Sequence, residues 1–471
     1  MTNRTYIKDL GGEVGKEVTI KGWVDIRRDQ GKMIFLDFRD ATGKVQGVIL
    51  PNYTETLEVG KTLRPEFVVE VVGKVNPRPE KNKKAGVLNG DIELEIKEIT
   101  ILNTAETVPF PINEDTRVVN EDSRLTYRYL DLRSDRMQKN IRARAKIQKL
   151  VRDELTADGF VEVETPLMSA PTPEGSRSYM VPSRLWKGNF YALPQSPQQY
   201  KQLLMVAGFE KYFQFARCMR DEDTRGDRQP EFTQLDLEMS FVEPEDIIQL
   251  NEKLLIKTVQ ELYPEKKIQT IPFPRMTYKD AMEKYGNDRP DIREDKNDPN
   301  LLAFLWIVDF PAFEKTGADN VDGTGEWTFT HNPFSKPQKE FEADLLAKQN
   351  IENIITTQYD ITLNGFEIGG GSIRNHTKAL QQAAFEIMGY SPERIESNFG
   401  HMIKALEFGA PPHGGIAWGF DRLVMLLENE PNIREVIPFA KTGEGKDLMM
   451  NAPAPMNEKQ MVELGISVNK K

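Results

Sequence analysis

Residues 217–238 read Arg217-Cys-Met-Arg-Asp-Glu-Asp-Thr-Arg-Gly-Asp-Arg-Gln-Pro-Glu-Phe-Thr-Gln-Leu-Asp-Leu-Glu238, and this stretch decides the fold of the larger part of the chain. Two strand-length runs that alternate charged and apolar residues flank a polar loop with one glycine, which is typical of a β-hairpin. Unpaired buried charges are costly, so a sheet carrying them is expected to surround an oriented, polyanionic substrate. The alternative is a surface hairpin with solvated ion pairs.

Three residues of this hairpin have side chains suited to a nucleotide. Arg220 and Glu222 lie two positions apart, and therefore on one face of a strand. Arg220 could hold a phosphate, while Glu222 could accept a hydrogen bond from an amino group. Phe232, on the returning strand, offers a ring on which a base could stack. The hairpin is therefore predicted to bind a nucleotide.

A second segment, 409–427, is a glycine-rich strand followed at once by an apolar helix. Glycines such as Gly415 and Gly419 allow a ligand to approach the backbone closely. Arg422 falls in the first turn of the predicted helix, beside Asp421, where a guanidinium can meet an anion or stack on a planar ring. This arrangement favours the same nucleotide site.

A third segment, 360–374, combines acidic residues with a run of three glycines. Asp360 and Glu367 are expected on a strand that leads to a tri-glycine turn, as a hard-cation site beside phosphates would need. Arg374 follows this turn and could bind a carboxylate through two of its guanidinium nitrogens. A flexible glycine hairpin with exposed charges is the alternative.

The composition is that of a globular enzyme in a reducing compartment. The 471 residues predict two to four domains, with 39% hydrophobic and 29% charged residues. No apolar run of 18 residues and no signal-peptide core occur, so we expect a cytoplasmic protein with no membrane segment. The single cysteine, Cys218, excludes an internal disulfide framework, and the four histidines are too far apart for a local metal motif. The net charge of −11 arises downstream of residue 110, which leaves the N-terminal region neutral.

The N-terminal region predicts a small β-domain. Five segments either alternate apolar with polar residues or are rich in β-branched residues, namely 18–26, 33–38, 45–50, 67–75 and 92–96. Five strands with a glycine-interrupted, bent first strand favour a closed oligonucleotide-binding (OB) barrel over residues 1–103. A β-sandwich accessory domain is the alternative.

The rest of the chain predicts an α+β domain. Residues 104–137, with Pro109 and Pro111, form the expected linker, and 138–471 the second domain. A helical period runs from Met137 to Asp158 and ends at Gly159. Further helices are expected at 197–206, 244–262, 377–388, 392–408 and 421–428. They alternate with strands, which predicts a mainly antiparallel sheet flanked by helices.

Taken together, these segments resemble the class II aminoacyl-tRNA synthetases, and within them the bacterial-type aspartyl-tRNA synthetases. Segments 220–222, 369–374 and 409–427 look like motifs 2 and 3 of the class, and 164–166 (Glu-Thr-Pro) looks like its motif 1, a dimer-interface segment. Segment 172–177 (Thr-Pro-Glu-Gly-Ser-Arg) is similar to the flipping loop, and 193–204 matches as well. The resemblance covers nearly the whole chain. It implies ATP-dependent charging of tRNA(Asp) with L-aspartate by a homodimer that uses Mg²⁺.

The resemblance also implies roles for individual residues. ATP contacts fall at Arg220, Asp221, Glu222, Gln229, Phe232, Glu367, Gly419, Phe420, Asp421 and Arg422. The catalytic residues among them are Arg220, Glu222 and Arg422. Aspartate contacts fall at Glu174, Ser196, Gln198, Lys201, Arg220, Asp236, His331 and Arg374. Mg²⁺ ligands fall at Asp360 and Glu367. Anticodon contacts on the barrel fall at Arg28, Asp29, Phe35, Gln46 and Glu93, with Phe35 as a stacking platform. By its sequence alone, Phe35 could instead be a core residue.

Two features depart from the family pattern. Bacterial aspartyl enzymes usually carry an inserted domain between motifs 2 and 3, but Asp291 and Leu301 are nearly contiguous here. His331 is followed by Asn332, where the family commonly has a second histidine. His413 lies in the approach to motif 3, and its role stays open.

Competing functions are distinguished by the charge of the amino-acid site. Lys201 and Arg374 suit an acidic side chain, which argues against asparaginyl- and lysyl-tRNA synthetases. A paralogue that binds tRNA or an adenylate without aminoacylation would show no aspartate-dependent pyrophosphate exchange. Gln30, near the expected anticodon reader, favours a relaxed enzyme that also charges tRNA(Asn).

Overall fold

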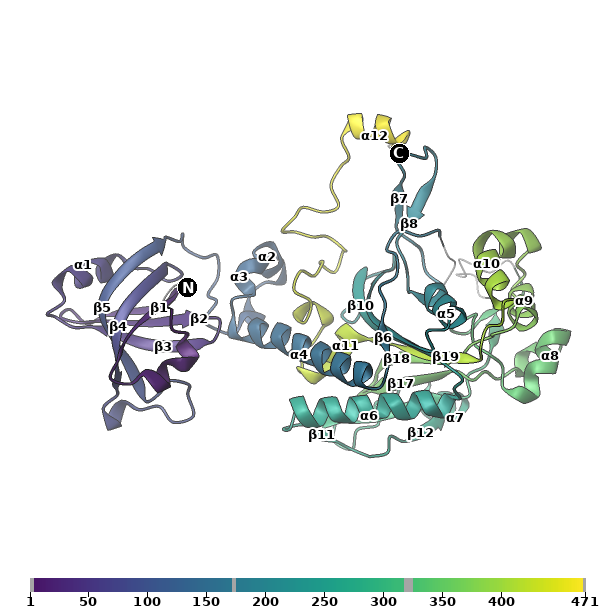
Figure 1. Cartoon of the computed structure of the whole chain (residues 1–471), viewed down its shortest axis with the longest axis horizontal. Helices are drawn as coiled ribbons and strands as arrows, with labels where there is room; N and C mark the ends of the chain where they lie inside the picture. Colours follow the sequence, from purple (N-terminus) through teal and green to yellow (C-terminus); the bar gives the residue numbers. More distant parts are fainter. Residues whose placement is uncertain (1–3, 172–174, 317–324, 469–471) are drawn as a thin grey trace. The chain divides into compact units, whose positions relative to one another are not determined.

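The computed structural model describes residues 4–171, 175–316 and 325–468. The chain divides into two compact units, residues 1–119 and 120–471 (Figure 1). The division lies inside the segment that was expected to be a linker, 104–137. Within the described residues, no helix is long and apolar enough to cross a membrane.

The first unit is a closed five-stranded barrel, in the strand order β1-β2-β3-β5-β4. This confirms the OB-type barrel over the β-sandwich. Its strands are β1 (Glu17–Asp29), β2 (Ile34–Asp40), β3 (Gly43–Ile49), β4 (Val68–Pro77) and β5 (Ile92–Asn103). Its helical segments are α1 (Thr54–Thr62), η1 (Ile7–Glu13), η2 (Glu80–Asn82) and η3 (Thr116–Val118). The first strand bends at a bulge between Val24 and Ile26. Two residues before the bulge, Gly22 is required, because a Cβ would lie 2.2 Å from the Arg39 carbonyl oxygen.

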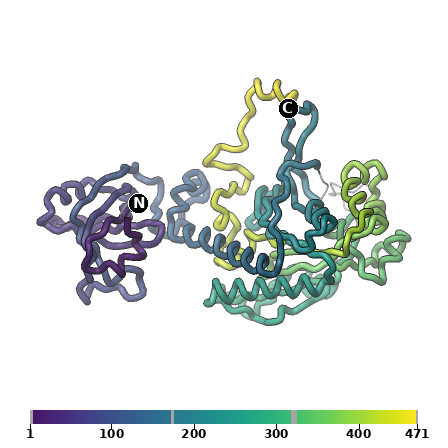
Figure 2. The backbone as a smooth tube through the Cα atoms, in the orientation of Figure 1, coloured from purple at the N-terminus to yellow at the C-terminus, as the bar shows by residue number. Residues whose placement is uncertain are grey.

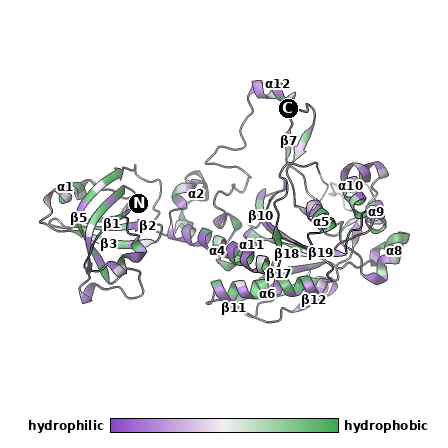
Figure 3. Ribbon diagram, in the orientation of Figure 1, coloured by the Kyte–Doolittle hydropathy of each residue, from purple (hydrophilic) through white to green (hydrophobic). Residues whose placement is uncertain are grey.

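Alternate residues of the barrel strands point inward, and Figure 3 shows polar and apolar residues mixed along them. In β2, for example, Ile34, Leu36 and Phe38 are buried in the barrel core. Phe35 and Asp37 are half-buried on the other face. The barrel therefore has a polar outer surface with one aromatic ring on β2.

The second unit is built on an eight-stranded sheet in the order β12-β14-β17-β18-β19-β10-β9-β6. Five of its seven strand pairs are antiparallel, as the sequence predicts. The strands of this sheet are β6 (Val161–Glu162), β9 (Lys211–Met219), β10 (Glu231–Ser240), β12 (Arg275–Thr277), β14 (Phe304–Val308), β17 (Tyr359–Leu363), β18 (Phe366–Ile373) and β19 (His413–Gly419). Smaller two-stranded sheets are formed by β7 (Met180–Pro182) with β8 (Phe190–Ala192), β11 (Lys267–Ile268) with β13 (Leu301–Leu302), and β15 (Phe313–Lys315) with β16 (Trp327–Phe329).

The second unit also contains helices, which can be followed along the backbone in Figure 2. They are α2 (Glu121–Thr126), α3 (Arg128–Asp131), α4 (Asp135–Ala157), α5 (Gln198–Val206), α6 (Pro244–Leu262), α7 (Tyr278–Tyr285), α8 (Glu342–Ala347), α9 (Lys378–Ile387), α10 (Pro392–Leu406), α11 (Phe420–Leu427) and α12 (Glu458–Leu464). Short 3-10 segments are η4 (Lys339–Phe341), η5 (Ile351–Asn353) and η6 (Ile433–Glu435). The main core lies where α4, α6 and α11 pack against the sheet, around buried rings such as Trp306, Trp418 and Phe213.

The structure adds two helices, α2 and α3, where the sequence suggested an irregular linker. Both belong to the second unit, and they bury two arginines. Arg124 pairs with Glu435 at 2.9 Å, and Arg128 pairs with Asp131 at 2.6 Å. Arg136 of α4 also reaches Glu435, at 2.9 Å. Since the partner of Arg124 lies 311 residues away, no local pattern in the sequence predicts this network.

Candidate active site

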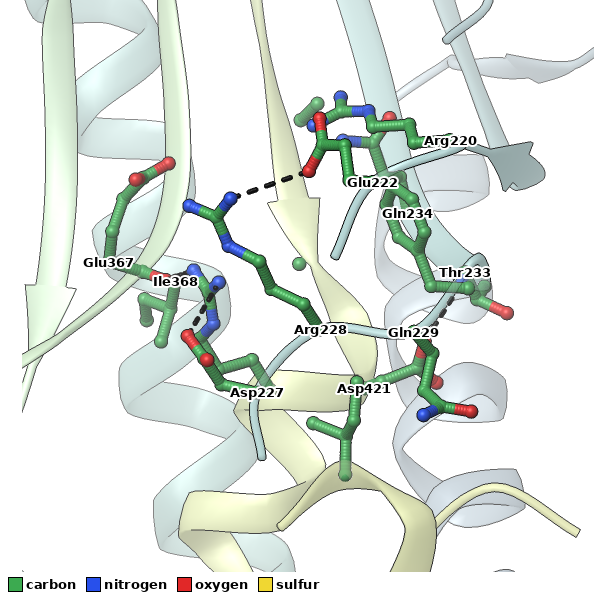
Figure 4. A pocket seen from close by; sticks show the side chains of 15 residues that line it. Arg220, Glu222, Asp227, Arg228, Gln229, Thr233, Gln234, Glu367, Ile368 and Asp421 are labelled. Carbon is green, nitrogen blue, oxygen red and sulfur yellow. Dashed lines mark hydrogen bonds and ion pairs between the residues drawn. The ribbon is translucent and has the colours of Figure 1, made fainter. Parts of the chain in front are cut away.

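A pocket of about 230 Å³ opens between the 220–230 loop, β18 and the start of α11 (Figure 4). Its lining residues are Arg220, Glu222, Asp227, Arg228, Gln229, Phe232, Thr233, Gln234, Glu367, Ile368, Ala417, Gly419, Asp421, Arg422 and Ile433. The hairpin β9–β10 and the strand–helix junction β19–α11 thus converge on one cavity. The three segments singled out in the sequence all contribute to it.

Arg220 and Phe232 lie together on one wall of the pocket. The Arg220 guanidinium is 5.1 Å from the centroid of the Phe232 ring, within range of a cation–π contact. Arg220 Nε donates to the carbonyl oxygen of Gln195 at 3.3 Å. Glu222 is exposed and pairs with Arg228 at 3.3 Å (Figure 4). A half-buried ring beside a guanidinium is suited to a base with an attached phosphate.

Arg422 bridges two elements across the pocket. Its Nη2 lies 3.1 Å from Asp227 Oδ2, and its Nη1 donates to the backbone carbonyl of Glu367. Arg422 is in the first turn of α11, as predicted. The guanidinium is thereby held between the 220–230 loop and β18, where it lines the pocket.

Other residues expected at ATP have mainly structural contacts. Asp421 is buried, accepts from the Thr233 amide at 2.7 Å and pairs with Arg144, so it fastens α11 to β10 and α4. The Phe420 ring lies in the core, edge-on to Phe215 with 5.1 Å between centroids. Only the backbone of Phe420 is left to contact a ligand. Gly419 lines the pocket directly.

Gln229 and Asp221 occupy different environments. Gln229 is buried; its Oε1 accepts from the Lys441 amide at 2.9 Å, while its Nε2 has no partner within the described ranges. A ligand acceptor in the pocket would satisfy this donor. Asp221 is exposed, and its backbone amide donates to the Arg177 carbonyl at 3.0 Å.

Next to this pocket lies a buried cluster of four ionisable side chains, which we call the ion cluster: Lys201, Asp236, Glu238 and Arg374. Each is at most 1% exposed. Lys201 Nζ lies 2.6 Å from Asp236 Oδ1 and 3.3 Å from Glu238 Oε2. Arg374 grips Glu238 with Nε at 2.9 Å and Nη2 at 3.2 Å. The cluster adjoins the pocket, because Asp236 pairs across strands with Ala417, a pocket residue.

The two carboxylates of the ion cluster have opposite pKa shifts. Burial raises the pKa of Asp236, and its contact with Lys201 only partly offsets this. Burial also acts to raise the pKa of Glu238, but Arg374 and then Lys201 outweigh it, so that pKa is lowered. Glu238 thus contacts both cations, and Lys201 is shared between Glu238 and Asp236. Sequence reasoning missed Glu238, although its position two residues after Asp236 places both on one face of β10.

The other residues expected at the amino acid lie in three places. Ser196 and Gln198 are at the start of α5, where Ser196 Oγ accepts a hydrogen bond from the backbone amide of Gln198 at 3.3 Å. His331 is exposed, with Nε2 3.6 Å from Asp288 Oδ2 and its ring 4.9 Å from that of Phe310. Among the contacts of the described residues, none joins His331 to the ion cluster. Glu174 lies outside the described residues.

The acidic pair Asp360 and Glu367 faces a glycine. A Cβ on Gly370 would lie 2.7 Å from Asp360 Oδ1 and 3.7 Å from Glu367 Oε1, so the two carboxylates converge over a residue without a side chain. Burial, followed by the charge of Glu367, raises the pKa of Asp360 well above its usual range. A divalent cation would relieve this repulsion. Within the described residues, no cluster of three or more acidic, histidine or cysteine side chains could hold a metal.

The expectation of a tri-glycine turn was wrong. Residues 369–371 lie inside β18, and the turn falls at Asn364 and Gly365, with φ of 51° and 88°. The glycines are needed because the neighbouring strands approach closely. A Cβ on Gly371 would be 2.0 Å from the Gly415 carbonyl oxygen.

The barrel brings four of the expected anticodon residues, Arg28, Phe35, Gln46 and Glu93, to one outer face. Arg28 is opposite Phe35 in the β1–β2 pair, and Gln46 is opposite Asp37 in the β2–β3 pair. Glu93 directly precedes Leu94, whose partner on β3 is the residue after Gln46. Phe35 is half-buried and outside the barrel core, unlike its neighbours in the strand. Asp29, at the end of β1, accepts from the Gly31 amide at 2.9 Å, which lowers the pKa of this carboxyl.

Family comparisons agree with this arrangement. Residues 120–443 match the family described as tRNA synthetases class II (D, K and N), and residues 18–102 match the OB-fold nucleic acid binding domain. The chain therefore belongs to the class II tRNA synthetases of the D, K and N group. Its relatives include the aspartate–tRNA(Asp/Asn) ligase of Natranaerobius thermophilus, 39% identical over the whole of both chains. They also include the aspartate–tRNA(Asp) ligase of Deinococcus radiodurans, 37% identical over 99% of each. Within the group, the chain belongs to the aspartate–tRNA ligase family.

Solved structures show a similar fold. The asparaginyl-tRNA synthetase of Pyrococcus horikoshii, complexed with asparaginyl-adenylate, aligns with a TM-score of 0.74 at 21% identity. The alignment covers 94% of this chain and 99% of that chain. At this identity, the likeness concerns the fold alone.

Proposed function

We propose that this chain activates L-aspartate with ATP and transfers the aspartyl group to the 3′ end of tRNA(Asp). The observation that carries the proposal is the pair of buried cations, Lys201 and Arg374, that Glu238 contacts beside the pocket of about 230 Å³. Two fixed cations select an acidic amino acid, and the adjacent pocket supplies the nucleotide. The polar face of the barrel would contact the anticodon.

ATP would enter the pocket with its adenine between Phe232 and Arg422. Arg220, beside the Phe232 ring, would then reach the α-phosphate. Glu222 and Gln229 would hold the nucleotide, Gln229 through its unpartnered Nε2. The remaining contacts would come from Asp221, from Glu367 and from the Gly419–Phe420–Asp421 backbone. These groups are fixed before the reaction, so catalysis is chiefly positioning and stabilisation of phosphate charge.

Asp360 and Glu367 would hold Mg²⁺. Two carboxylates converging over Gly370 suit this ion, which usually takes one or two carboxylates together with phosphate oxygens and water. Bound there, Mg²⁺ would neutralise charge on the ATP phosphates. The raised pKa of Asp360 fits such a site, because the pair repels itself without a cation.

In the first step, an oxygen of the aspartate α-carboxylate would attack the α-phosphorus of ATP. A new P–O bond forms, the bond to the β-phosphate oxygen breaks, and pyrophosphate leaves with the electron pair. In the second step, a 3′-terminal ribose hydroxyl of tRNA would attack the carbonyl carbon of the aspartyl-adenylate. A C–O ester bond forms, the bond from this carbon to the phosphate oxygen breaks, AMP leaves with the electron pair, and the hydroxyl proton is released to water. Arg220, near the α-phosphate in both steps, would stabilise the developing negative charge.

The β-carboxylate of aspartate would bind Lys201 and Arg374. Asp236, once relieved of Lys201, would take the α-ammonium group together with Gln198 and Ser196, and Glu174 and His331 would complete the site. The uncharged amide of asparagine would leave two buried cationic donors poorly paired, which costs about a few kcal/mol. This difference supports aspartate over asparagine.

The remaining parts of the chain would serve tRNA binding and assembly. We propose residues 1–103 as the anticodon-binding domain, 104–137 as the linker and 138–471 as the catalytic domain. The usual insertion near residues 291–301 is absent in this proposal. The alignment with the Natranaerobius ligase extends over 596 positions, more than the 471 residues of the chain, and this excess supports the proposal. The motif 1 segment 164–166 would take part in a cytoplasmic homodimer.

The range of tRNAs is a separate question. Relatives at similar identity bear both names, an Asp/Asn ligase at 39% and an Asp ligase at 37%. We propose that tRNA(Asn) is also accepted, on the strength of the exposed polar Gln30 next to Asp29.

Charging of purified tRNA(Asp) and tRNA(Asn) with labelled aspartate tests both proposals. Product on tRNA(Asp) supports the ligase function, and product on tRNA(Asn) supports the relaxed range. An absence of product on tRNA(Asn) alone overturns only the range. If neither tRNA is charged and aspartate drives no pyrophosphate exchange, the chain is a binding paralogue instead.

A further inference from the structure

We propose that His413 is a positioning residue for the amino-acid site. Through Gln202, its imidazole sets the direction of the Gln198 side-chain amide, so that Gln198 presents its oxygen, Oε1, to the α-ammonium group of aspartate. This inference rests on the proposed function, because only there does Gln198 contact a substrate.

A chain of three hydrogen bonds links the histidine to the substrate contact. His413 Nδ1 is 2.7 Å from the carbonyl oxygen of Pro411, which can only accept, so Nδ1 carries the hydrogen. In the neutral ring, Nε2 is then an acceptor, and it accepts a hydrogen bond from Gln202 Nε2 at 3.1 Å. Gln202 Oε1 in turn accepts from Gln198 Nε2 at 3.2 Å. Each link fixes the direction of the next.

The end of this chain is Gln198 Oε1. Within the described residues, this oxygen accepts no hydrogen bond, whereas the amide nitrogen is already engaged. Gln198 lies in the first turn of α5, three residues before Lys201, so both side chains project from the same side of the helix. The free acceptor is therefore near the ion cluster, where an α-ammonium group would need one.

Burial makes the direction of the amides hard to reverse. His413 is fully buried, Gln202 is 1% exposed and Gln198 is 7% exposed. Rotating the Gln202 amide by 180° would set its oxygen against the lone pair of His413 Nε2. It would also set its nitrogen against the nitrogen of Gln198. Without water to compensate, Gln198 would have to rotate too and would present N–H groups to an ammonium.

The surroundings keep the imidazole neutral. Burial lowers the pKa of His413, and Arg374 and His376 act in the same direction. Glu238 and the hydrogen bond to the Pro411 carbonyl act to raise this pKa but do not offset burial, and the two Glu238 oxygens are already engaged by Arg374 and Lys201. A neutral ring is the state in which Nε2 can accept from Gln202.

Two substitutions separate this role from a purely structural one. In His413→Gln, the side-chain oxygen can reach the position of Nε2 and accept from Gln202, although the bond to Pro411 is lost. In His413→Asn, the shorter amide can still donate to Pro411, but no acceptor reaches Gln202. The positioning role predicts that the Gln variant keeps function, and an anchoring role for the Pro411 bond predicts the reverse.

The test is aspartate-dependent ATP–pyrophosphate exchange by the full chain. We expect His413→Asn to raise KM for aspartate about tenfold, with kcat and KM for ATP within about twofold, since one charge-assisted contact is lost. His413→Gln should stay within about threefold of wild type, as should the control His401→Gln on α10. Combining His413→Asn with Gln202→Leu should add less than about twofold to the effect of Gln202→Leu alone.

The outcomes are distinguishable. The proposal is overturned if His413→Asn keeps the wild-type KM for aspartate, if only the Asn variant retains function, or if the double variant shows additive losses. Wild-type chain without aspartate-dependent exchange would instead overturn the proposed function. Thermal unfolding of each variant identifies losses caused by misfolding, and the Gln202→Leu variant then tests the relay by itself.

Discussion

Replacing Lys201 with methionine tests the amino-acid site, because methionine keeps most of the length of the side chain and removes its charge. Lys201 Nζ lies 2.6 Å from Asp236 and 3.3 Å from Glu238 in a fully buried cluster. Truncating one partner of such a buried charge contact costs about 2–4 kcal/mol in binding, which is about 30- to 700-fold. We therefore expect kcat/KM for aspartate to fall by about this factor. KM for ATP should change less than about twofold, since Lys201 does not line the nucleotide pocket.

The assay is pyrophosphate exchange, with aspartate varied at saturating ATP and ATP varied at saturating aspartate. Lys211→Met is the matched control, because Lys211 lies on β9 and its contacts, with Asp158 at 3.0 Å and with the ring of Phe160, are outside the ion cluster. It should leave both constants unchanged. Urea unfolding should show that Lys201→Met is less stable than wild type by up to about 3–5 kcal/mol, since two carboxylates lose a partner. Unchanged aspartate kinetics in a folded Lys201→Met variant would refute the assignment, as would equal losses for aspartate and ATP.

Three further predictions concern other parts of the chain. Asp360→Asn should raise the Mg²⁺ concentration needed for half-maximal exchange about tenfold, and an unchanged Mg²⁺ titration would remove Asp360 from the metal site. Phe35→Ala should lower kcat/KM for tRNA charging about tenfold or more while sparing pyrophosphate exchange, and loss of both would make Phe35 a folding residue. Glu435→Gln should destabilise the fold by about 3 kcal/mol at neutral pH. Burial opposes ionisation of Glu435, but Arg124 and Arg136 outweigh it and lower its pKa from 4.5 to about 2. This contribution is full above pH 4.5 and is lost as pH falls toward 2, so the two urea curves should converge in acid, and a constant difference would contradict the assignment.

Local patterns in the sequence were sufficient for most of the fold. The hairpin β9–β10 and the helix α11 follow from alternation, periodicity and turn residues that act over a few positions. The glycines 369–371 led to the wrong prediction of a turn, because a run of glycines can occur either in a turn or where two strands approach closely. The Asn364–Gly365 pair was the true turn signal.

The site was less predictable than the fold. Arg220, Phe232 and Arg422 line the pocket as expected. They could be predicted because each lies in a segment whose local pattern of charged, aromatic and glycine residues already indicates a nucleotide site. Glu238 and His413 were not assigned roles, because their importance comes from buried partners on other strands and helices. A carboxylate that holds two cations together has no local pattern of its own.

The central claim is tested most directly by comparing aspartate and asparagine as substrates in ATP–pyrophosphate exchange by the full chain. The ion cluster predicts that aspartate supports exchange and that kcat/KM for asparagine is lower by about a hundredfold or more. No exchange with aspartate, or equal exchange with asparagine, would contradict the assignment of Lys201 and Arg374 to a substrate carboxylate.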